Sequence, residues 1–279
     1  MSFRVLPRAE LIALVLAWAG AAGCSSCGNG GGFDAGRPDV PVAGGTISLA
    51  WSLIDDATNR PVTCDRIDPN ATVFVQLSHE GTGSVESFAC KPLQGTSITA
   101  FPPGAYTATA ELHMPVSGQA VTIATATPQG GVVIRSGQDI GLTPVVFHVN
   151  ATGRLELMLR AGAAGNCAGG AAITGFSISL EHNGDPPDTG CAPVVFALSG
   201  GGTYNANDCS SPAVTRCIAA SETLTVASLP SGPYRIHIRG KKGTLDCWSN
   251  DDALRVPPQG RSLAETLNLA FASEMPGCQ

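Results

Sequence analysis

Hydrophobic and polar residues alternate with a period of two along much of the chain after residue 44. The alternation is clearest in two segments, whose apolar positions are Ile47, Leu49, Trp51 and Leu53, and Leu155, Leu157 and Leu159. A period of two places successive side chains on opposite faces of a strand. No long stretch has the apolar spacing of a helix. The pattern therefore predicts an all-β protein in which each strand buries one face, as in a β-sandwich.

These alternating strands belong to an internal repeat. Each copy has an opening strand, a cysteine, a second strand, another cysteine, a Pro-x-Gly-x-Tyr turn and a closing strand. Proline fixes φ and glycine permits positive φ, so this turn is tight, and Tyr106 or Tyr234 begins the strand after it. We expect two tandem antiparallel β-sandwich domains, at residues 44–150 and 151–279.

The second copy is longer because it contains an insertion at residues 185–208. The insertion includes Pro186-Pro187 and three consecutive glycines, which predicts a loop. Loops on rigid sandwiches often carry recognition, so we expect a recognition surface here. Trp248 follows Cys247 in a turn-rich stretch. Its ring could join that surface if it is exposed, or it could pack on a disulfide.

The amino terminus has the layout of an export signal. Arg4 and Arg8 precede an apolar run of about a dozen residues, and small residues follow it up to Cys24. The run is too short to span a bilayer. The whole layout predicts a signal peptide at 1–23. The glycines and prolines after it predict a flexible Gly/Pro-rich tether at 24–43. An ordinary signal peptidase could instead cut after the sequence Ala-Gly-Ala that ends at residue 21.

Ten cysteines in an exported chain indicate disulfide bonds. The repeat makes Cys64–Cys90 and Cys167–Cys217 equivalent pairs. The second copy holds six cysteines, which allow many pairings. Proximity favours Cys191–Cys209 and Cys247–Cys278. Cys27 is then the unpaired cysteine, if Cys24 carries a lipid.

The small residues before Cys24 resemble the lipobox of bacterial lipoproteins. That resemblance implies an acylated Cys24 as the first mature residue and a lipid anchor in the cell envelope. Ser25 is compatible with sorting to the outer membrane, on its periplasmic face or at the cell surface.

The Pro-x-Gly-x-Tyr elements resemble the hairpin of prealbumin-like domains, which include carboxypeptidase-regulatory-like and Cna-B-type Ig-like modules. The elements run from Pro102 to Tyr106 and from Pro230 to Tyr234. The whole layout resembles tandem-domain lipoproteins of myxobacterial type. The resemblance implies an Ig-like fold and does not imply a function.

The net charge and the sequence motifs that are absent exclude several classes of function. The formal net charge is −6, so the basic surface that nucleic-acid binding requires is absent. His79 and His182 occupy matching repeat positions, which suits either a metal site or water-facing strand ends. The acidic pairs Asp55-Asp56 and Asp251-Asp252 are expected to be solvated turn residues rather than calcium ligands. No zinc-protease, nucleophile-elbow or phosphate-loop motif occurs.

We therefore expect no catalytic residue, no cofactor and no metal site. The sequence favours a non-catalytic, membrane-anchored spacer or binding module for an envelope or extracellular protein or glycan. The alternatives are a carbohydrate-binding or adhesion module and, from another class, a secreted hydrolase or metal-binding protein.

Overall fold

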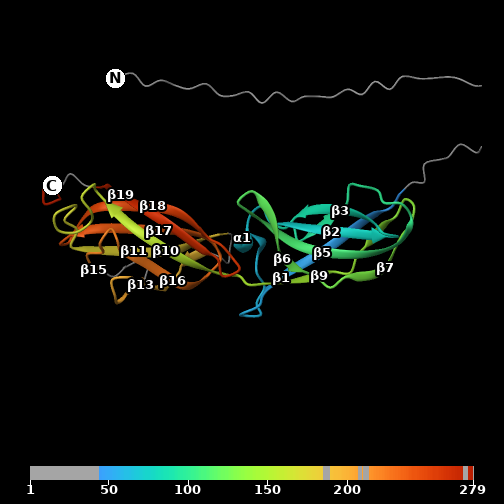
Figure 1. The fold of residues 1–279 in the computed structure, drawn as a ribbon, viewed down its shortest axis with the longest axis horizontal. Helices are drawn as coiled ribbons and strands as arrows, with labels where there is room; N and C mark the ends of the chain where they lie inside the picture. Colours follow the sequence, from blue (N-terminus) through green and yellow to red (C-terminus); the bar gives the residue numbers. More distant parts are fainter. Residues whose placement is uncertain (1–43, 185–188, 207–208, 210–213, 273–275, 279) are drawn as a thin grey trace, which may run out of the picture. The chain divides into compact units, whose positions relative to one another are not determined.

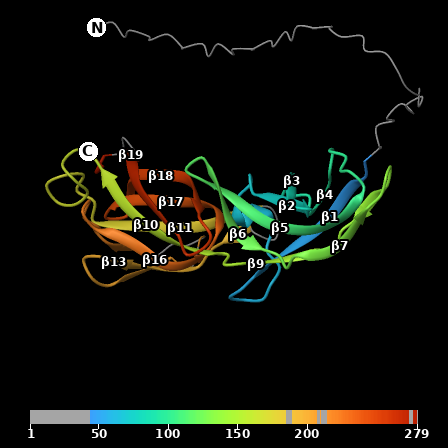
Figure 2. The ribbon, with the colours of Figure 1, turned by 45° about the vertical axis from the view of Figure 1, so that its right-hand side comes forward.

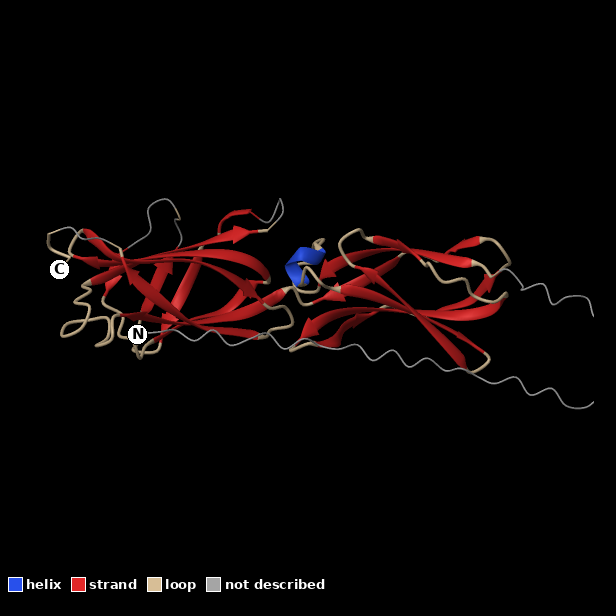
Figure 3. Ribbon diagram, turned by 90° about the horizontal axis from the view of Figure 1, so that it is seen from above, coloured by secondary structure: helices blue, strands red, loops and turns tan. Residues whose placement is uncertain are grey.

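A computed structural model describes residues 44–184, 189–206, 209, 214–272 and 276–278. The described chain is built almost entirely from strands, which confirms the predicted all-β class (Figures 1 and 3). It contains two separate hydrophobic cores, one within residues 47–151 and the other within residues 155–269. That 44–150 and 151–279 fold as independent domains stays a prediction.

The first sandwich places two sheets over the first core. In one sheet β1 pairs antiparallel with β4 and parallel with β8 and β9; in the other the order is β3-β2-β5-β6, with β7 also paired to β5. Its elements are β1 (Thr46–Asp55), α1 (Cys64–Ile67), β2 (Thr72–His79), β3 (Thr82–Ala89), β4 (Gln94–Thr96), β5 (Gly104–Val116), β6 (Gln119–Thr125), β7 (Gln129–Ile134), β8 (Asp139–Gly141) and β9 (Val145–Val149).

The second sandwich is one hydrogen-bonded path of strands around the second core. The order is β12-β11-β17-β18-β19-β10-β16-β13-β14, with β15 also paired to β11, and β19 joins the two layers (Figure 2). Its strands are β10 (Thr152–Ala161), β11 (Gly175–Asn183), β12 (Thr189–Cys191), β13 (Val194–Leu198), β14 (Thr203–Ala206), β15 (Val214–Arg216), β16 (Thr223–Pro230), β17 (Gly232–Lys242), β18 (Leu245–Val256) and β19 (Ser262–Phe271).

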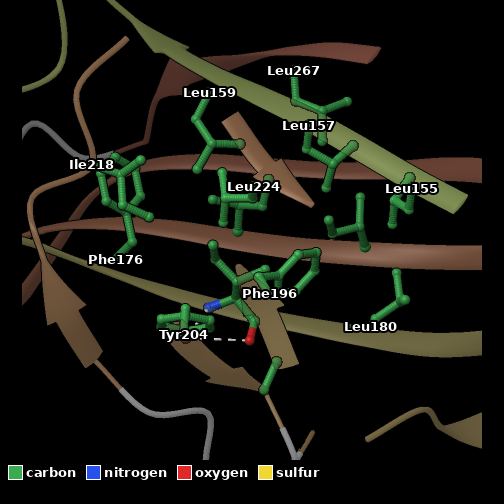
Figure 4. Close-up of a cluster of buried hydrophobic side chains, with 14 of the residues drawn as sticks. Leu155, Leu157, Leu159, Phe176, Leu180, Phe196, Tyr204, Ile218, Leu224 and Leu267 are labelled. Carbon is green, nitrogen blue, oxygen red and sulfur yellow. Dashed lines mark hydrogen bonds between the residues drawn. The ribbon is translucent and has the colours of Figure 1, made fainter. Parts of the chain in front are cut away.

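The opening strands alternate as the sequence predicts. In β1 the apolar side chains from Ile47 to Leu53 are buried at every second position, and β10 buries Leu155, Leu157 and Leu159 in the same way (Figure 4). Each opening strand also pairs in parallel with the closing strand of its own sandwich, β1 with β9 and β10 with β19. The expectation of purely antiparallel sandwiches is therefore wrong at this pairing, because the two strands are joined by a long crossover and not by a hairpin. The two sandwiches therefore share one topology.

The Pro-x-Gly-x-Tyr elements form matching turns in both sandwiches. The hydroxyl of Tyr106 donates to the carbonyl of Pro102 at 2.9 Å, and that of Tyr234 donates to the carbonyl of Pro230 at 2.6 Å. Both rings are buried. Each tyrosine thus fills its core and ties the strand that it begins back to the turn before it.

The insertion is not a loop, and the prediction for residues 185–208 is wrong in this respect. Residues 185–188 and 207–208 lie outside the described residues, but the part between them forms β12 and the β13–β14 hairpin. The hairpin extends the layer that contains β16. It buries Val194, Phe196, Leu198, Tyr204 and Ala206 in the second core. Pro186-Pro187 precede this alternating apolar pattern and the three glycines at 200–202 form the turn between β13 and β14, so the composition of the whole insertion resembled that of a loop.

The inserted residues also interrupt an edge strand. In the first sandwich β3 pairs with β2 along eight consecutive residues. In the second sandwich that edge is shared by two short strands, since β12 pairs with β11 at residues 181–183 and β15 pairs with it at 175–177. Among the described residues, none pairs as a strand with residues 178–180 of β11 on this side.

The hydroxyl of Tyr204 replaces part of the missing strand. It accepts a hydrogen bond from the Ile178 amide at 2.7 Å and lies 3.3 Å from the Ile178 carbonyl, to which it donates (Figure 4). Nearby, the amide of Ala192 donates to the Leu180 carbonyl. Burial raises the pKa of Tyr204, so its hydroxyl keeps the proton that it donates. The hairpin therefore satisfies the backbone that its own insertion exposes.

Tyr204→Phe should destabilise the second sandwich while leaving the hairpin packed. The ring remains, but two buried backbone groups of Ile178 lose their partner, which costs about 1–3 kcal/mol. Urea unfolding followed by circular dichroism measures the change. Val195→Ala, on an exposed position of the same hairpin, is the control and should change stability by less than about 0.5 kcal/mol. Equal stability of Tyr204→Phe and the parent would contradict the role of the hydroxyl.

Candidate functional site

Four disulfide bonds anchor the surface segments of the two sandwiches. They are Cys64–Cys90, Cys167–Cys217, Cys191–Cys209 and Cys247–Cys278, the same four pairs that the repeat and proximity favour. Cys191–Cys209 closes the base of the inserted hairpin. Cys64–Cys90 ties α1 to the end of β3. The bonds fix loops and strand ends, so their role here is structural.

The predicted anchor lies outside the described residues. Cys24, the signal at 1–23 and the tether at 24–43 are all in that part of the chain. Within the part that is described, no helix is both long enough and apolar enough to cross a bilayer.

The paired histidines pack against the turn tyrosines. The rings of His79 and Tyr106 lie 4.9 Å apart, and those of His182 and Tyr234 lie 4.7 Å apart. His79 also contacts the Ala105 carbonyl through Nδ1 at 2.8 Å. Among the described residues, no three His, Cys, Asp or Glu side chains come together in a way that could hold a metal ion. The repeat position of these histidines is thus explained by packing.

Acidic residues make ion pairs on the outer face of the second sandwich. Asp251 lies 2.6 Å from Nδ1 of His237 and 3.0 Å from the guanidinium of Arg239. Partial burial raises the pKa of Asp251, but its hydrogen bonds to Arg239 and His237 outweigh that effect and hold the pKa below its usual value. Asp251 is therefore exposed, as the sequence suggests, but it lies in the strand β18 and is paired, not in a turn.

Trp248 is half-buried at one end of the second sandwich. It packs against the core and meets Phe271 edge to face, with ring centroids 5.3 Å apart. A Cβ on Gly162 would lie 3.6 Å from the indole, so the ring reaches across to the end of β10. The ring that offers a large exposed surface is that of Phe271, which is 44% exposed. Of the two aromatic residues, sequence reasoning named only the tryptophan.

An open trough lies on the outer surface at the same end of the second sandwich. It has a volume of about 740 Å³ and runs beside the last residues of β10 and β19. Its lining comes from β10, β19 and the segments near 162–165 and 220–221: Met158, Arg160, Gly162, Ala163, Gly165, Ala220, Ser221, Asn268 and the largely buried Leu269. Sequence reasoning missed this site because it is formed by residues far apart in the chain. The trough brings a cation, an amide and a hydroxyl together beside apolar side chains.

A second cluster joins the two sandwiches. Only Asn150 and Ala151 separate β9 from β10, and Ala151 is fully buried. The Asp55 carboxylate accepts hydrogen bonds from the amides of Ala151 and Thr58 and from the Thr58 hydroxyl. The Ala151 carbonyl accepts from the amide of Ser231 in the second sandwich. Both the amide and the carbonyl of Ala151 are therefore hydrogen-bonded.

Two arginines complete this joint, which we define as Asp55, Arg66, Ala151, Ser231 and Arg255. Nε of Arg66 donates to the Ser231 carbonyl at 3.3 Å, and a terminal nitrogen lies 3.5 Å from the Ala151 carbonyl. Arg255 donates to the Asp65 carbonyl at 2.7 Å. Helix α1 carries both Arg66 and Asp65 and contacts β17. The sequence suggested that Asp55 is a solvated turn residue, and burial in the joint corrects this expectation.

Comparisons with known proteins give only loose likenesses. No protein-family model matches the sequence, and no curated protein sequence matches it. Among solved structures, the Bacillus anthracis TIE protein aligns with 82% of this chain at 10% identity and a TM-score of 0.31, and this chain spans 34% of that protein.

Two further solved structures come from pili or fimbriae. GBS52, the minor pilin of Streptococcus agalactiae, aligns with 83% of this chain and 98% of its own at 13% identity and a TM-score of 0.23. The fimbrial anchor protein Mfa2 from Porphyromonas gingivalis aligns with 75% of this chain and 82% of its own at 10% identity and a TM-score of 0.28. Likenesses at this level assign no function.

Asp55→Asn should destabilise the protein at neutral pH by about 1–3 kcal/mol, because hydrogen bonds to a buried carboxylate weaken. Burial raises the pKa of Asp55, but its hydrogen bonds to Thr58, Ala151 and Ala57 outweigh burial and hold the pKa below its usual value. A lowered pKa in the folded state stabilises the fold above the unfolded-state pKa, about 3.9, and this contribution is lost as the pH falls through the folded-state value.

Urea unfolding at pH 7 and at pH 3 tests whether the stabilisation by Asp55 is lost as the pH falls. The gap in unfolding free energy between parent and variant should be larger at pH 7. Asp56→Asn, at an exposed neighbouring position, is the control and should show little gap at either pH. A gap for Asp55→Asn that stays constant with pH would contradict a stabilising carboxylate.

Proposed function

We propose that this chain is a lipid-anchored, non-catalytic spacer and binding module of the cell envelope, with two sandwiches carried on a tether. The lipid on Cys24 holds it at a membrane, with the outer membrane as the expected destination. The partner is a protein or glycan of the envelope or the surroundings.

The hydrogen bonds of the joint are the observation that best supports the spacer role. A two-residue linker with both backbone groups of Ala151 hydrogen-bonded has little freedom to swing. A spacer must fix its binding end relative to its anchor, and a stiff connection does this at no entropic cost when the partner binds. The freedom of movement relative to the membrane comes instead from the predicted tether, which has a root-mean-square reach of about 25 Å for some 20 residues.

The trough favours a carbohydrate-binding or adhesion module as the second candidate. Hydrogen-bonding side chains beside apolar ones, with the exposed ring of Phe271 on the same end of the sandwich, suit a sugar. This candidate is compatible with the spacer role, because the trough lies on the second sandwich and the tether precedes the first.

Cys24→Ser should release the protein from the membrane fraction or leave its signal uncleaved, because the acylated thiol is the proposed anchor. Fractionation and mass spectrometry of the mature amino terminus measure both outcomes. Cys27→Ser is the matched control, three residues further on, and should stay membrane-bound. Normal processing and full membrane retention of Cys24→Ser would refute the lipid anchor.

Replacing both Asp55 and Arg66 by alanine should loosen the joint. In the parent, amide ¹⁵N relaxation should give both sandwiches one rotational correlation time, since they tumble together. In the double variant the two correlation times should separate. Asp56→Ala with Arg60→Ala is the control, since both residues lie exposed in the same sandwich. A single shared correlation time in the Asp55/Arg66 variant would contradict the role of these two residues in the joint.

A further inference from the structure

The trough on the second sandwich is built around a pair of side chains that the strand register brings together. Arg160 in β10 and Asn268 in β19 are direct partners in the parallel pairing of these strands. Side chains at partner positions lie on the same face, with strands about 4.8 Å apart. The guanidinium and the amide therefore stand side by side on the outer surface, where Ser221 also lines the trough.

Arg160 keeps its charge available for a ligand. It is exposed, and among the described residues it has no hydrogen-bond or ion-pair partner. Three other cations of this sandwich are engaged, since Arg216 pairs with Glu222, Arg239 with Asp251 and Lys241 with Asp246, whereas Arg235 and Arg261 lie outside the trough. An unpaired guanidinium offers the planar fork of donors that carboxylates accept in bidentate fashion.

The remaining lining indicates a sugar that carries the carboxylate. Asn268 and Ser221 can both donate and accept, as ring hydroxyl groups require. The half-buried Met158, on the same face of β10 as Arg160, supplies apolar surface for the C–H face of a pyranose.

We infer that the trough binds an acidic polysaccharide through its uronic acid units, with Arg160 holding the carboxylate and Asn268 and Ser221 holding hydroxyl groups. One cation among neutral hydrogen-bonding groups matches a ligand with one carboxylate per ring and several hydroxyls. The net charge of −6 opposes every polyanion, and more strongly one of higher charge density, such as a run of acidic residues, which would also need more cations than the single Arg160.

The first sandwich shows that the fold itself does not require this pair. At the same register of β1 and β9 the partners are Ile54 and His148. A parallel closing strand is thus compatible with an apolar residue where the second sandwich has Arg160. The arginine and asparagine are features of the second sandwich alone.

This inference rests on the proposed binding role but is independent of the anchor. The test titrates the purified chain with polygalacturonate, with dextran as a neutral polysaccharide and polyglutamate as an acidic polypeptide, and measures affinity by calorimetry. The parent should bind polygalacturonate, more weakly as salt rises, and should not bind dextran. Arg160→Gln should weaken this binding about tenfold or more, because a charge-assisted hydrogen-bond pair is lost. Ser221→Glu, which places a negative charge in the trough, should weaken it as well.

Arg154→Gln is the matched control, because Arg154 is an exposed arginine at the other end of β10 and pairs weakly with Glu156 at 3.8 Å. It should change the affinity by less than about twofold. No binding of polygalacturonate by the parent, or equal binding by Arg160→Gln and the parent, would overturn the inference. Binding of polyglutamate as tight as that of polygalacturonate would overturn the assignment to a saccharide. None of these results would alter membrane retention through Cys24, so failure here is distinguishable from failure of the anchored-module proposal.

Discussion

The parallel pairing of the opening and closing strands constrains both sandwiches more than any other interaction. Because β9 runs beside β1 in the same direction, both strands end at the same end of the first sandwich. The chain therefore leaves β9 next to Asp55, the last residue of β1, and Ala151 is within reach of that carboxylate. A closing strand of opposite direction would end at the far side, and the two-residue linker could not be clamped there. The joint is thus a consequence of topology.

The second sandwich shows how such a fold accepts an insertion. Residues added to an edge strand break its ladder and leave buried backbone groups without partners, which is costly. The inserted hairpin offsets this cost in two ways. It adds apolar side chains to the core, and it brings the Tyr204 hydroxyl to the unpaired backbone of Ile178. An interrupted edge also offers less continuous backbone to another chain than the unbroken β3 does.

Much of the fold could be predicted from the sequence, because alternation and repetition are local or pairwise signals. The burial of Ile47 to Leu53 followed from alternation, and the matching turns at Tyr106 and Tyr234 followed from the repeat. Two disulfide pairs followed from the repeat and the other two from proximity along the chain. The hairpin was missed because composition was judged across the whole insertion, although Val194, Phe196 and Leu198 alternate within it. The joint and the trough could not be predicted, since Asp55 with Ala151 and Arg160 with Asn268 meet only through strand register.

The same end of the same fold serves two purposes in this chain. In the first sandwich, the residues after the opening strand and the helix α1 bind the linker and the second sandwich, and Asp55 is buried there. In the second sandwich, the corresponding end carries an exposed arginine at the position where the first has Ile54. The buried Asp55 carboxylate holds the neighbouring sandwich because it is hydrogen-bonded, whereas binding a ligand requires polar groups left without partners. Asp55 and Arg160 illustrate the two requirements at nearly equivalent places.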